Sequence, residues 1–316
     1  MPTALRTVLI LAVFILLGSA DQVLAWGPAT HVGLASTILD RLALLPAGIA
    51  AILGRHAIAY LYGNIAADMV FAKKWSRVKQ SCHHWSTAFQ LLDRARDDRA
   101  RAFAYGYLSH LAADTVAHGK FIPRQIIVSE CSVNLGHFYW ELRTDAAQPR
   151  AVWTLIEQVV RQDHSDHHDA LQQHLTDTFL SYEMNLLVFE RMNALTLGQG
   201  FRRTMSLWHR FSRLDLPVHL MEGYKDECLD RVHSILAKGL HSPVLREDPN
   251  GTSAMMHVRV RRREVRRMKR GGLPVERRRD EVSRYLGPKP GPPVDFAAVG
   301  TSTSPRQSVR NVAICR

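Results

Sequence analysis

The chain has 316 residues, of which 46% are hydrophobic and 22% are charged. This composition can build a buried core and excludes a wholly disordered or fibrous protein. The formal net charge is +12, which is typical of proteins that bind nucleic acid or anionic membranes. The charge is uneven, because residues 255–316 contribute +11 and residues 1–254 only +1. The sequence therefore predicts a near-neutral body, which contains 15 of the 16 His residues, followed by a basic tail.

The first 25 residues have the features of a secretory signal peptide. Arg6 supplies the positive flank, Val8–Gly18 is a short apolar core, and small residues precede the cleavage site at Ala25. A membrane anchor is the alternative, but Asp21 ends the apolar run short of the ~20 residues that a membrane span needs. We therefore expect a secreted or periplasmic mature protein that begins at Trp26.

The body has apolar residues at helical spacing, with Gly or Pro between the segments. The pattern predicts helices over His31–Leu45, Ile49–Tyr62, His83–Asp97, Arg99–His118, Ala151–Gln162, Leu171–Leu197, Phe201–Leu214 and Pro217–Leu240. The single strand candidate, Phe121–Ser129, looks like an extended loop. The predicted fold class is all-α, with one multi-helix domain over residues 26–250. A basic tail over 251–316 should be largely disordered, although its first, Arg-rich piece could form a helix.

The first candidate metal-binding motif lies at the end of the helix predicted over Arg99–His118. Residues four apart share one face of a helix, so His110, Asp114 and His118 form a single stripe. Two imidazoles with a carboxylate between them can hold a metal at each end of the carboxylate. His137 and Glu141 repeat the spacing. One such pair alone is more often an ordinary feature of a helix, but the combination favours Zn²⁺.

Further candidate ligands lie upstream. His83 and His84 place imidazoles before an amphipathic helix, and Asp68 ends an apolar run in which an unpaired carboxylate would be costly to bury. Removal of the signal peptide would also free the α-amine of Trp26. That amine, the carbonyl oxygen of Trp26 and the imidazole of His31 could then chelate a metal.

Taken together and in order, nine residues resemble the ligand set of the trinuclear zinc phosphodiesterases: Trp26, His31, Asp68, His84, His110, Asp114, His118, His137 and Glu141. This group includes the bacterial zinc-dependent phospholipase C enzymes, the fungal secreted single-strand nucleases and the N-terminal domain of glycosylphosphatidylinositol-specific phospholipase D. The resemblance covers roughly a third of the chain. It implies an all-α fold of the zinc-dependent phospholipase C type.

The resemblance implies three zinc ions. The ligands of the first ion would be Asp68, His84, His110 and Asp114, and those of the second His118, His137 and Glu141. The third ion would be held by Trp26 and His31, with Asp114 bridging it to the first. His83 is the alternative to His84, which is preferred because it directly precedes Trp85, as in the phospholipase D-like branch. Asp145 is a substitute for the last ligand of the second ion. The implied reaction is hydrolysis of a phosphodiester, in which Asp68 also accepts the proton of the attacking water.

Two details favour a phospholipase over a nuclease. His118 follows Asp114 by four residues, as in the phospholipase D-like branch, whereas the small phospholipase C enzymes and the nucleases leave six. The last ligand is Glu141, where the nucleases carry Asp. We therefore expect a phospholipase C-type hydrolase of phospholipids. A nuclease stays an alternative because Trp85 and Phe138–Trp140 could stack bases, and a non-catalytic zinc- or lipid-binding module is a second alternative.

Three other features carry weaker predictions. The histidines at positions 164, 167, 168 and 174 are interpreted as a solvated helix start with incidental metal affinity. An oxidising compartment would permit a disulfide, for which Cys82 and Cys131 are the expected pair. The basic tail could contact anionic lipid headgroups, which suits the predicted substrate, or nucleic acid, or remain a solvated extension. No obligate protein partner is implied.

Overall fold

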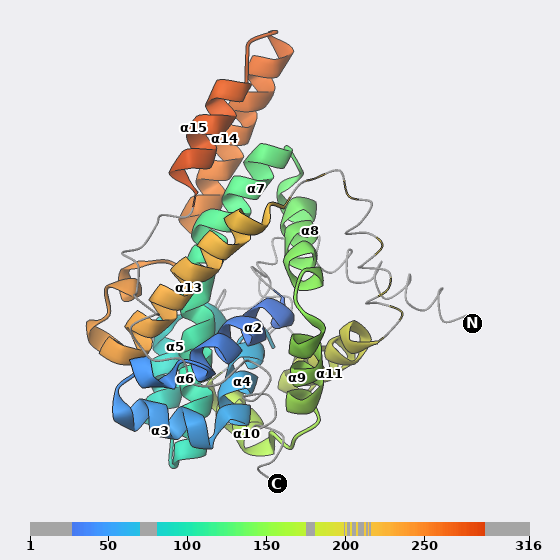
Figure 1. Ribbon diagram of the computed structural model, residues 1–316. Helices are drawn as coiled ribbons and strands as arrows, with labels where there is room; N and C mark the ends of the chain where they lie inside the picture. Colours follow the sequence, from blue (N-terminus) through green and yellow to red (C-terminus); the bar gives the residue numbers. More distant parts are fainter. Residues whose placement is uncertain are drawn as a thin grey trace.

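The computed structural model describes residues 27–69, 81–174, 181–198 and 216–287, together with single residues between 199 and 215. Within these ranges the regular structure is helical and contains no strand (Figure 1), which confirms the all-α prediction. None of the helices found there is long and apolar enough to span a membrane. The predicted signal peptide, Trp26 and residues 288–316 lie outside the described part of the chain.

The predicted helix Phe201–Leu214 lies largely outside the described residues, and two of the other predicted helices are each divided. The helix Val133–Ala146, which carries His137 and Glu141, was not among the predicted ranges. Ile49–Tyr62 is broken at His56, whose φ of −119° and ψ of 43° are not helical. In Leu171–Leu197, Ser181 is not helical and a new helix begins at Tyr182. The helices of the body are α2 (Pro28–Leu39), α3 (Ala47–Arg55), α4 (Ala57–Ala66), α5 (Trp85–Asp93), α6 (Asp98–Val116), α7 (Ile122–Ser129), α8 (Val133–Ala146), α9 (Arg150–Val160), α10 (Ser165–His174), α11 (Tyr182–Leu197) and α13 (Val218–Lys238).

Helix α6 lies at the centre, with α4, α5 and α13 packed around it. The closest approach is between α4 and α6, at two glycines. A Cβ on Gly63 would lie 2.1 Å from the carbonyl oxygen of Phe103, and a Cβ on Gly106 would lie 2.0 Å from that of Tyr60. Only glycine permits such close backbone contact. The C-terminal turn of α4 is thereby held against the middle of α6.

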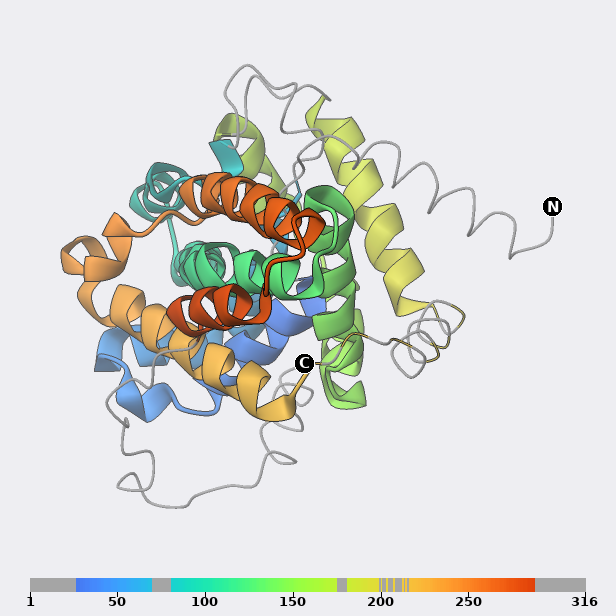
Figure 2. The ribbon, with the colours of Figure 1, turned by 90° about the horizontal axis from the view of Figure 1, so that it is seen from above.

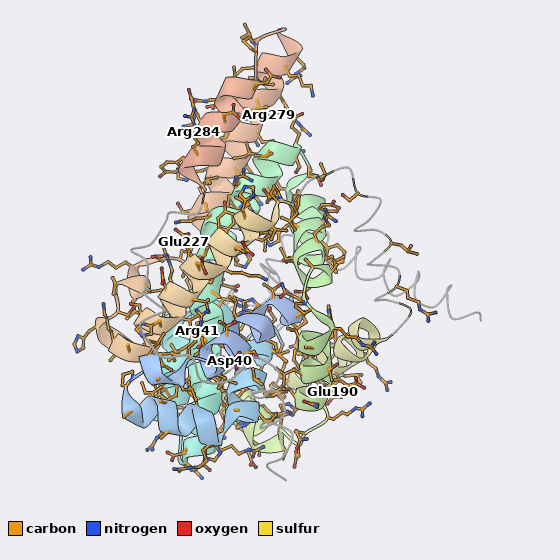
Figure 3. The ribbon with its side chains drawn as sticks, viewed as in Figure 1. Asp40, Arg41, Glu190, Glu227, Arg279 and Arg284 are labelled. Atoms are coloured by element: carbon orange, nitrogen blue, oxygen red, sulfur yellow. The ribbon has the colours of Figure 1, made fainter. Side chains whose placement is uncertain are left out.

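The segment Phe121–Ser129 is helical, which corrects the expectation of an extended loop. Helix α6 continues into a π-helical turn, Ala117–Phe121, and then into α7. The Ile-rich run resembled a strand because β-branched residues favour strands, but its isoleucines are buried against other helices. The π turn is tied to α13 by Lys120, whose Nζ lies 2.7 Å from Oε1 of the buried Glu227, labelled in Figure 3.

Helical structure continues beyond residue 250, where the sequence placed the end of the folded domain. Helices α14 (Thr252–Arg270) and α15 (Glu276–Tyr285) pack on α7, and the view from above in Figure 2 shows one on each side of it. Met255, Val258 and Val265 form the buried face of α14. The hydroxyl of Tyr224 in α13 donates to the carbonyl oxygen of Leu286 at 2.8 Å. A few apolar residues are enough here because α7 supplies the opposing wall.

Two of the four histidines around α10, His164 and His167, are buried, which corrects the expectation of a solvated helix start. His164 is 5% exposed and His167 is 2% exposed. The ring of His164 stacks on Tyr62 with centroids 3.5 Å apart, and that of His167 stacks on Phe103 at 4.4 Å. Burial lowers the pKa of His164 to about 4 and that of His167 to about 3. These rings therefore serve as neutral aromatic core residues near neutral pH.

This burial predicts acid sensitivity. Below the ordinary His pKa of 6.5 the unfolded chain binds a proton that folded His167, with a pKa of about 3, does not take up. The stability that the neutral His167 ring contributes is therefore present above pH 6.5 and is lost as the pH falls below that value. The variant His167→Phe keeps the ring stack but cannot titrate. Between pH 7 and pH 5 the wild type should lose about 2 kcal/mol more free energy of unfolding than the variant, measured by urea denaturation. Equal losses would contradict the prediction.

Candidate metal centre

The predicted ligands converge on Asp114, in the last turn of α6, which is 1% exposed. Its Oδ1 lies 3.2 Å from Nε2 of His31 in α2. Its Oδ2 lies 3.1 Å from Nε2 of His110 and 3.2 Å from Nε2 of His83. Nε2 of His118 in the π turn lies 3.7 Å from the same oxygen. Four imidazoles therefore surround one buried carboxylate, two of them from α6 and the π turn that continues it, and two from elsewhere in the chain.

Asp68, just beyond the end of α4, adds a second carboxylate. Its Oδ1 lies 3.2 Å from Nε2 of His83, and its Oδ2 lies 3.8 Å from Nε2 of His110. Two sets of potential ligand atoms each lie within 4.8 Å of one another, one from His31, Asp68 and His110, the other from His83, His110 and Asp114. The Asp68 side chain is 18% exposed, so it is the carboxylate of this cluster that reaches solvent.

The contact between α4 and α6 orients the His110 ring. Nδ1 of His110 donates to the carbonyl oxygen of Asn64 at 2.9 Å. A ring that donates from Nδ1 presents the lone pair of Nε2, which is the arrangement usual for metal-ligating histidines. Asn64 directly follows Gly63, so the close helix packing places its carbonyl oxygen. No pattern of residues indicates this role, because every residue carries a carbonyl group.

The structure brings His83, and not His84, to the cluster. The His83 side chain is 1% exposed and Nε2 lies 3.2 Å from oxygens of both Asp68 and Asp114, whereas His84 is exposed. His83 ends the 3₁₀ turn Ser81–His83, whereas His84 has an extended backbone, with φ of −105° and ψ of 138°, before α5. This change of backbone conformation separates the directions of the two side chains. The preference for His84 is therefore corrected in favour of His83.

Residues 247–251 support the site from outside, a role that sequence reasoning missed. Asn250 Nδ2 donates to the carbonyl oxygen of His83 at 3.1 Å. Gly251 packs against His118 so closely that a Cβ on Gly251 would lie 2.5 Å from both Cβ and the carbonyl oxygen of His118. The indole of Trp85 donates to the carbonyl oxygen of Glu247 at 3.1 Å. This segment thus contacts both ends of the cluster, although it carries no ligand motif.

His118, His137 and Glu141 form a second group. His137 Nε2 lies 3.1 Å from Oε1 of Glu141 across one turn of α8, and the rings of His118 and His137 have centroids 5.2 Å apart. Burial lowers the pKa of His118 well below its ordinary value and that of His137 to about 4. Both rings are therefore neutral at physiological pH, which is the state that a metal ligand requires.

His118 also provides a test of whether the residues fit a metal. Both of its ring nitrogens are buried, and neither has a hydrogen-bond partner among the residues that the structure describes. A buried polar group without a partner is costly. A zinc ion accepts imidazole nitrogen and carboxylate oxygen as ligands, and both are present beside His118. The residues therefore fit zinc.

Asp145, the substitute ligand, belongs to α8, and its carboxylate lies beside the first turn of α2. Its carboxylate accepts the N–H of Ala29 at 3.2 Å, the N–H of Thr30 at 2.9 Å and the hydroxyl of Thr30 at 2.7 Å. Burial raises the pKa of Asp145 to about 6. The residue therefore anchors the first turn of α2, which carries His31, to α8. Trp26, the remaining expected ligand, lies outside the described residues.

Within the described part of the chain, Cys82 and Cys131 are not joined in a disulfide, which corrects the expected pairing. Cys82 is buried. Its Sγ lies 3.2 Å from Nδ1 of His83, and its carbonyl oxygen accepts the hydroxyl of Tyr107 at 2.5 Å. Cys82 therefore belongs to the surroundings of the metal centre, whereas Cys131 lies beyond the end of α7.

Comparison with protein families agrees with this geometry. The family model for zinc-dependent phospholipase C matches residues 30–188, a range that contains His31, Glu141 and the candidate ligands between them. The chain therefore belongs to the zinc-dependent phospholipase C family, as its resemblance predicted. Zinc dependence follows from the family. No curated protein and no solved structure matches the chain.

Gly251 allows a test of the outer support. Its φ is +60°, and an added Cβ would collide with His118. In Gly251→Ala we expect a lower zinc content and a lower Tm, because strain and steric conflict act together. Gly272→Ala is the matched control, since Gly272 has a φ of +66° but no atom within 4 Å of an added Cβ. Zinc analysis and thermal unfolding would check this, and equal zinc content in both variants would contradict it.

The choice between adjacent histidines can also be tested. His83→Ala removes a buried ring that contacts two carboxylates, so we expect the purified variant to contain less zinc than the wild type. His84→Ala removes an exposed ring and should leave the zinc content unchanged. The measurement is elemental analysis of protein purified without chelator. A zinc loss confined to the His84 variant would reverse the assignment.

Proposed function

We propose that the protein is a secreted or periplasmic phosphodiesterase of the phospholipase C type, acting on phospholipids with three zinc ions. The observation that carries the proposal is the convergence of four imidazoles on the buried Asp114, in a chain of the zinc-dependent phospholipase C family. The proposed ligands are Asp68, His83, His110 and Asp114 for the first ion, His118, His137 and Glu141 for the second, and Trp26 and His31 for the third.

Three residues of the chain have separate roles in such a site. Zinc, when bound, supplies Lewis acidity toward a phosphate ester and lowers the pKa of water. Asp114 lies buried among the imidazoles and holds negative charge at the centre of the site. Asp68 is positioned to accept a proton from the attacking water, because its carboxylate contacts the cluster and also reaches solvent. Asn64 holds the ring of His110 through its carbonyl oxygen.

The proposed location rests on the N-terminal sequence. Arg6, the apolar run Val8–Gly18 and the small residues before Trp26 favour export and cleavage. Cleavage would free the amine that the third ion needs, and α2 with His31 begins two residues after Trp26. Export would therefore be a condition for an intact site.

A nuclease using the same ligands is less well supported. Base stacking needs exposed aromatic rings near the metals. Trp140 is 2% exposed, and the indole N–H of Trp85 is engaged with the carbonyl oxygen of Glu247. Two of the aromatic residues that kept this alternative open are thus used in packing.

The function can be tested with zinc-loaded protein and two substrates, phosphatidylcholine and single-stranded DNA. We expect release of phosphocholine, loss of that activity on treatment with a zinc chelator, and recovery on addition of zinc. Asp68→Asn removes a proposed ligand carboxylate that is also the proposed base, so it should lower kcat by about a hundredfold or more. Cleavage of DNA with phosphatidylcholine untouched would contradict the proposal, as would full activity after removal of zinc.

A further inference from the structure

Helices α14 and α15 carry a concentrated positive charge that the metal centre does not use. Residues 252–287 contain 12 Arg and Lys residues against 4 Asp and Glu residues, a net charge of +8. Figure 3 shows Arg279 and Arg284 on this helical pair, which projects from the rest of the molecule. We call residues 252–287 the basic arm. Most of the net charge of the chain thus belongs to an ordered, projecting element.

The basic arm is fixed to the body at Glu130, at the end of α7. The Glu130 carbonyl oxygen accepts a hydrogen bond from Nη2 of Arg262 at 3.1 Å. Its carboxylate pairs with Nζ of Lys269 at 3.2 Å and also with Arg279. Together with the buried apolar face of α14, these contacts hold the arm in a defined orientation on α7.

A different set of side chains points away from α7. Steps of four and three residues repeat along one face of a helix, and five residues of α14 follow this spacing. All five are exposed: Met256, Val260, Arg263, Arg267 and Arg270. We call them the outer stripe.

The outer stripe lies on the side of α14 opposite the buried Val258 and Val265. Met256 is 60% exposed and Val260 is 52% exposed, and Leu273 in the loop after α14 is 57% exposed. Apolar side chains beside arginines form a surface that is both cationic and partly hydrophobic.

Among the side chains that the structure describes, no ion pair joins a carboxylate of the arm to an arginine of the outer stripe. Glu264 pairs with Nη1 of Arg261 at 2.9 Å, and Glu281 pairs with Nη1 of Arg278 at 3.1 Å. These partners lie outside the outer stripe. The stripe arginines therefore present their charge to solvent.

We propose that the basic arm docks the protein on a membrane surface rich in anionic phospholipid, with the outer stripe facing the headgroups. Arginines near such a surface gain from its negative potential, and exposed apolar side chains beside them can enter the headgroup region. Met256 and Val260 distinguish a lipid surface from a nucleic acid, because the phosphate backbone offers no apolar layer for them. The inference concerns attachment and holds independently of which bond the metal centre hydrolyses.

The arm begins beside the metal centre. Gly251, which precedes α14, packs against His118, and Asn250 holds His83. A docked arm would therefore keep the centre at a set position relative to the lipid surface, since no flexible linker separates the two.

Vesicle sedimentation with the zinc-loaded full chain tests the proposal. We expect binding to phosphatidylcholine vesicles that contain phosphatidylglycerol, and little binding to phosphatidylcholine alone. Reversing Arg263, Arg267 and Arg270 to Glu should lower the partition coefficient by about a hundredfold, because each basic residue near an anionic surface contributes about fivefold. The control reverses Arg94, Arg96 and Arg150, which are exposed on the body, and should bind as the wild type does.

A second variant separates apolar contact from charge. Met256→Ser with Val260→Ser should weaken binding most at high salt, where charge attraction is screened. Hydrolysis of a soluble short-chain substrate should be the same in the stripe variant as in the wild type. The proposal is overturned if the wild type ignores anionic vesicles, if the control loses as much binding as the stripe variant, or if stripe reversal abolishes binding to single-stranded DNA while leaving vesicle binding intact.

Discussion

The buried carboxylate of Asp114 is the constraint on which the rest of the structure depends. A carboxylate at 1% exposure is costly unless cations or hydrogen bonds compensate it. Here the groups around it are imidazoles that cannot all be charged. Burial and the nearby His110 lower the pKa of His31; burial opposes the charged form of His110 too, but Asp114 and Asp68 outweigh it and raise the pKa of that ring. Zinc ions meet this constraint with fixed positive charge that requires no protonated ring.

The ligands are held around Asp114 by contacts with residues that are not themselves proposed ligands. The glycine contact between α4 and α6 sets the Asn64 carbonyl oxygen against the ring of His110. Asp145 fixes the first turn of α2 and with it His31. Gly251 limits the space beside His118. Each ligand is thus held by a group from a different element, which agrees with the general need of metal ligands for outer partners.

Whether a feature of the site could be predicted from the sequence depends on how far apart along the chain the interacting residues lie. The stripe of His110, Asp114 and His118 was predictable because helical spacing is local, and the same holds for His137 with Glu141. The choice between His83 and His84 was not, because it depends on the backbone conformation where the 3₁₀ turn ends and the extended residue His84 follows. Contacts over long sequence separations, such as Asn250 with His83, leave no pattern in the chain. The burial of His164 and His167 depends in the same way on partners from α4 and α6.

The basic arm shows why composition alone does not locate the end of the helical structure. Its mean character is strongly polar, yet Met255, Val258 and Val265 recur on one side of a helix, and one apolar side is enough when a neighbouring helix covers it. Glu130 then pairs with charges that would otherwise repel one another at the base of the arm. The remaining positive charge is consequently displayed in a fixed direction, on an element that begins at Gly251 against His118. Attachment of this surface to a membrane would therefore set the position of the metal centre relative to the membrane, because the arm and the metal centre are in contact at Gly251 and His118.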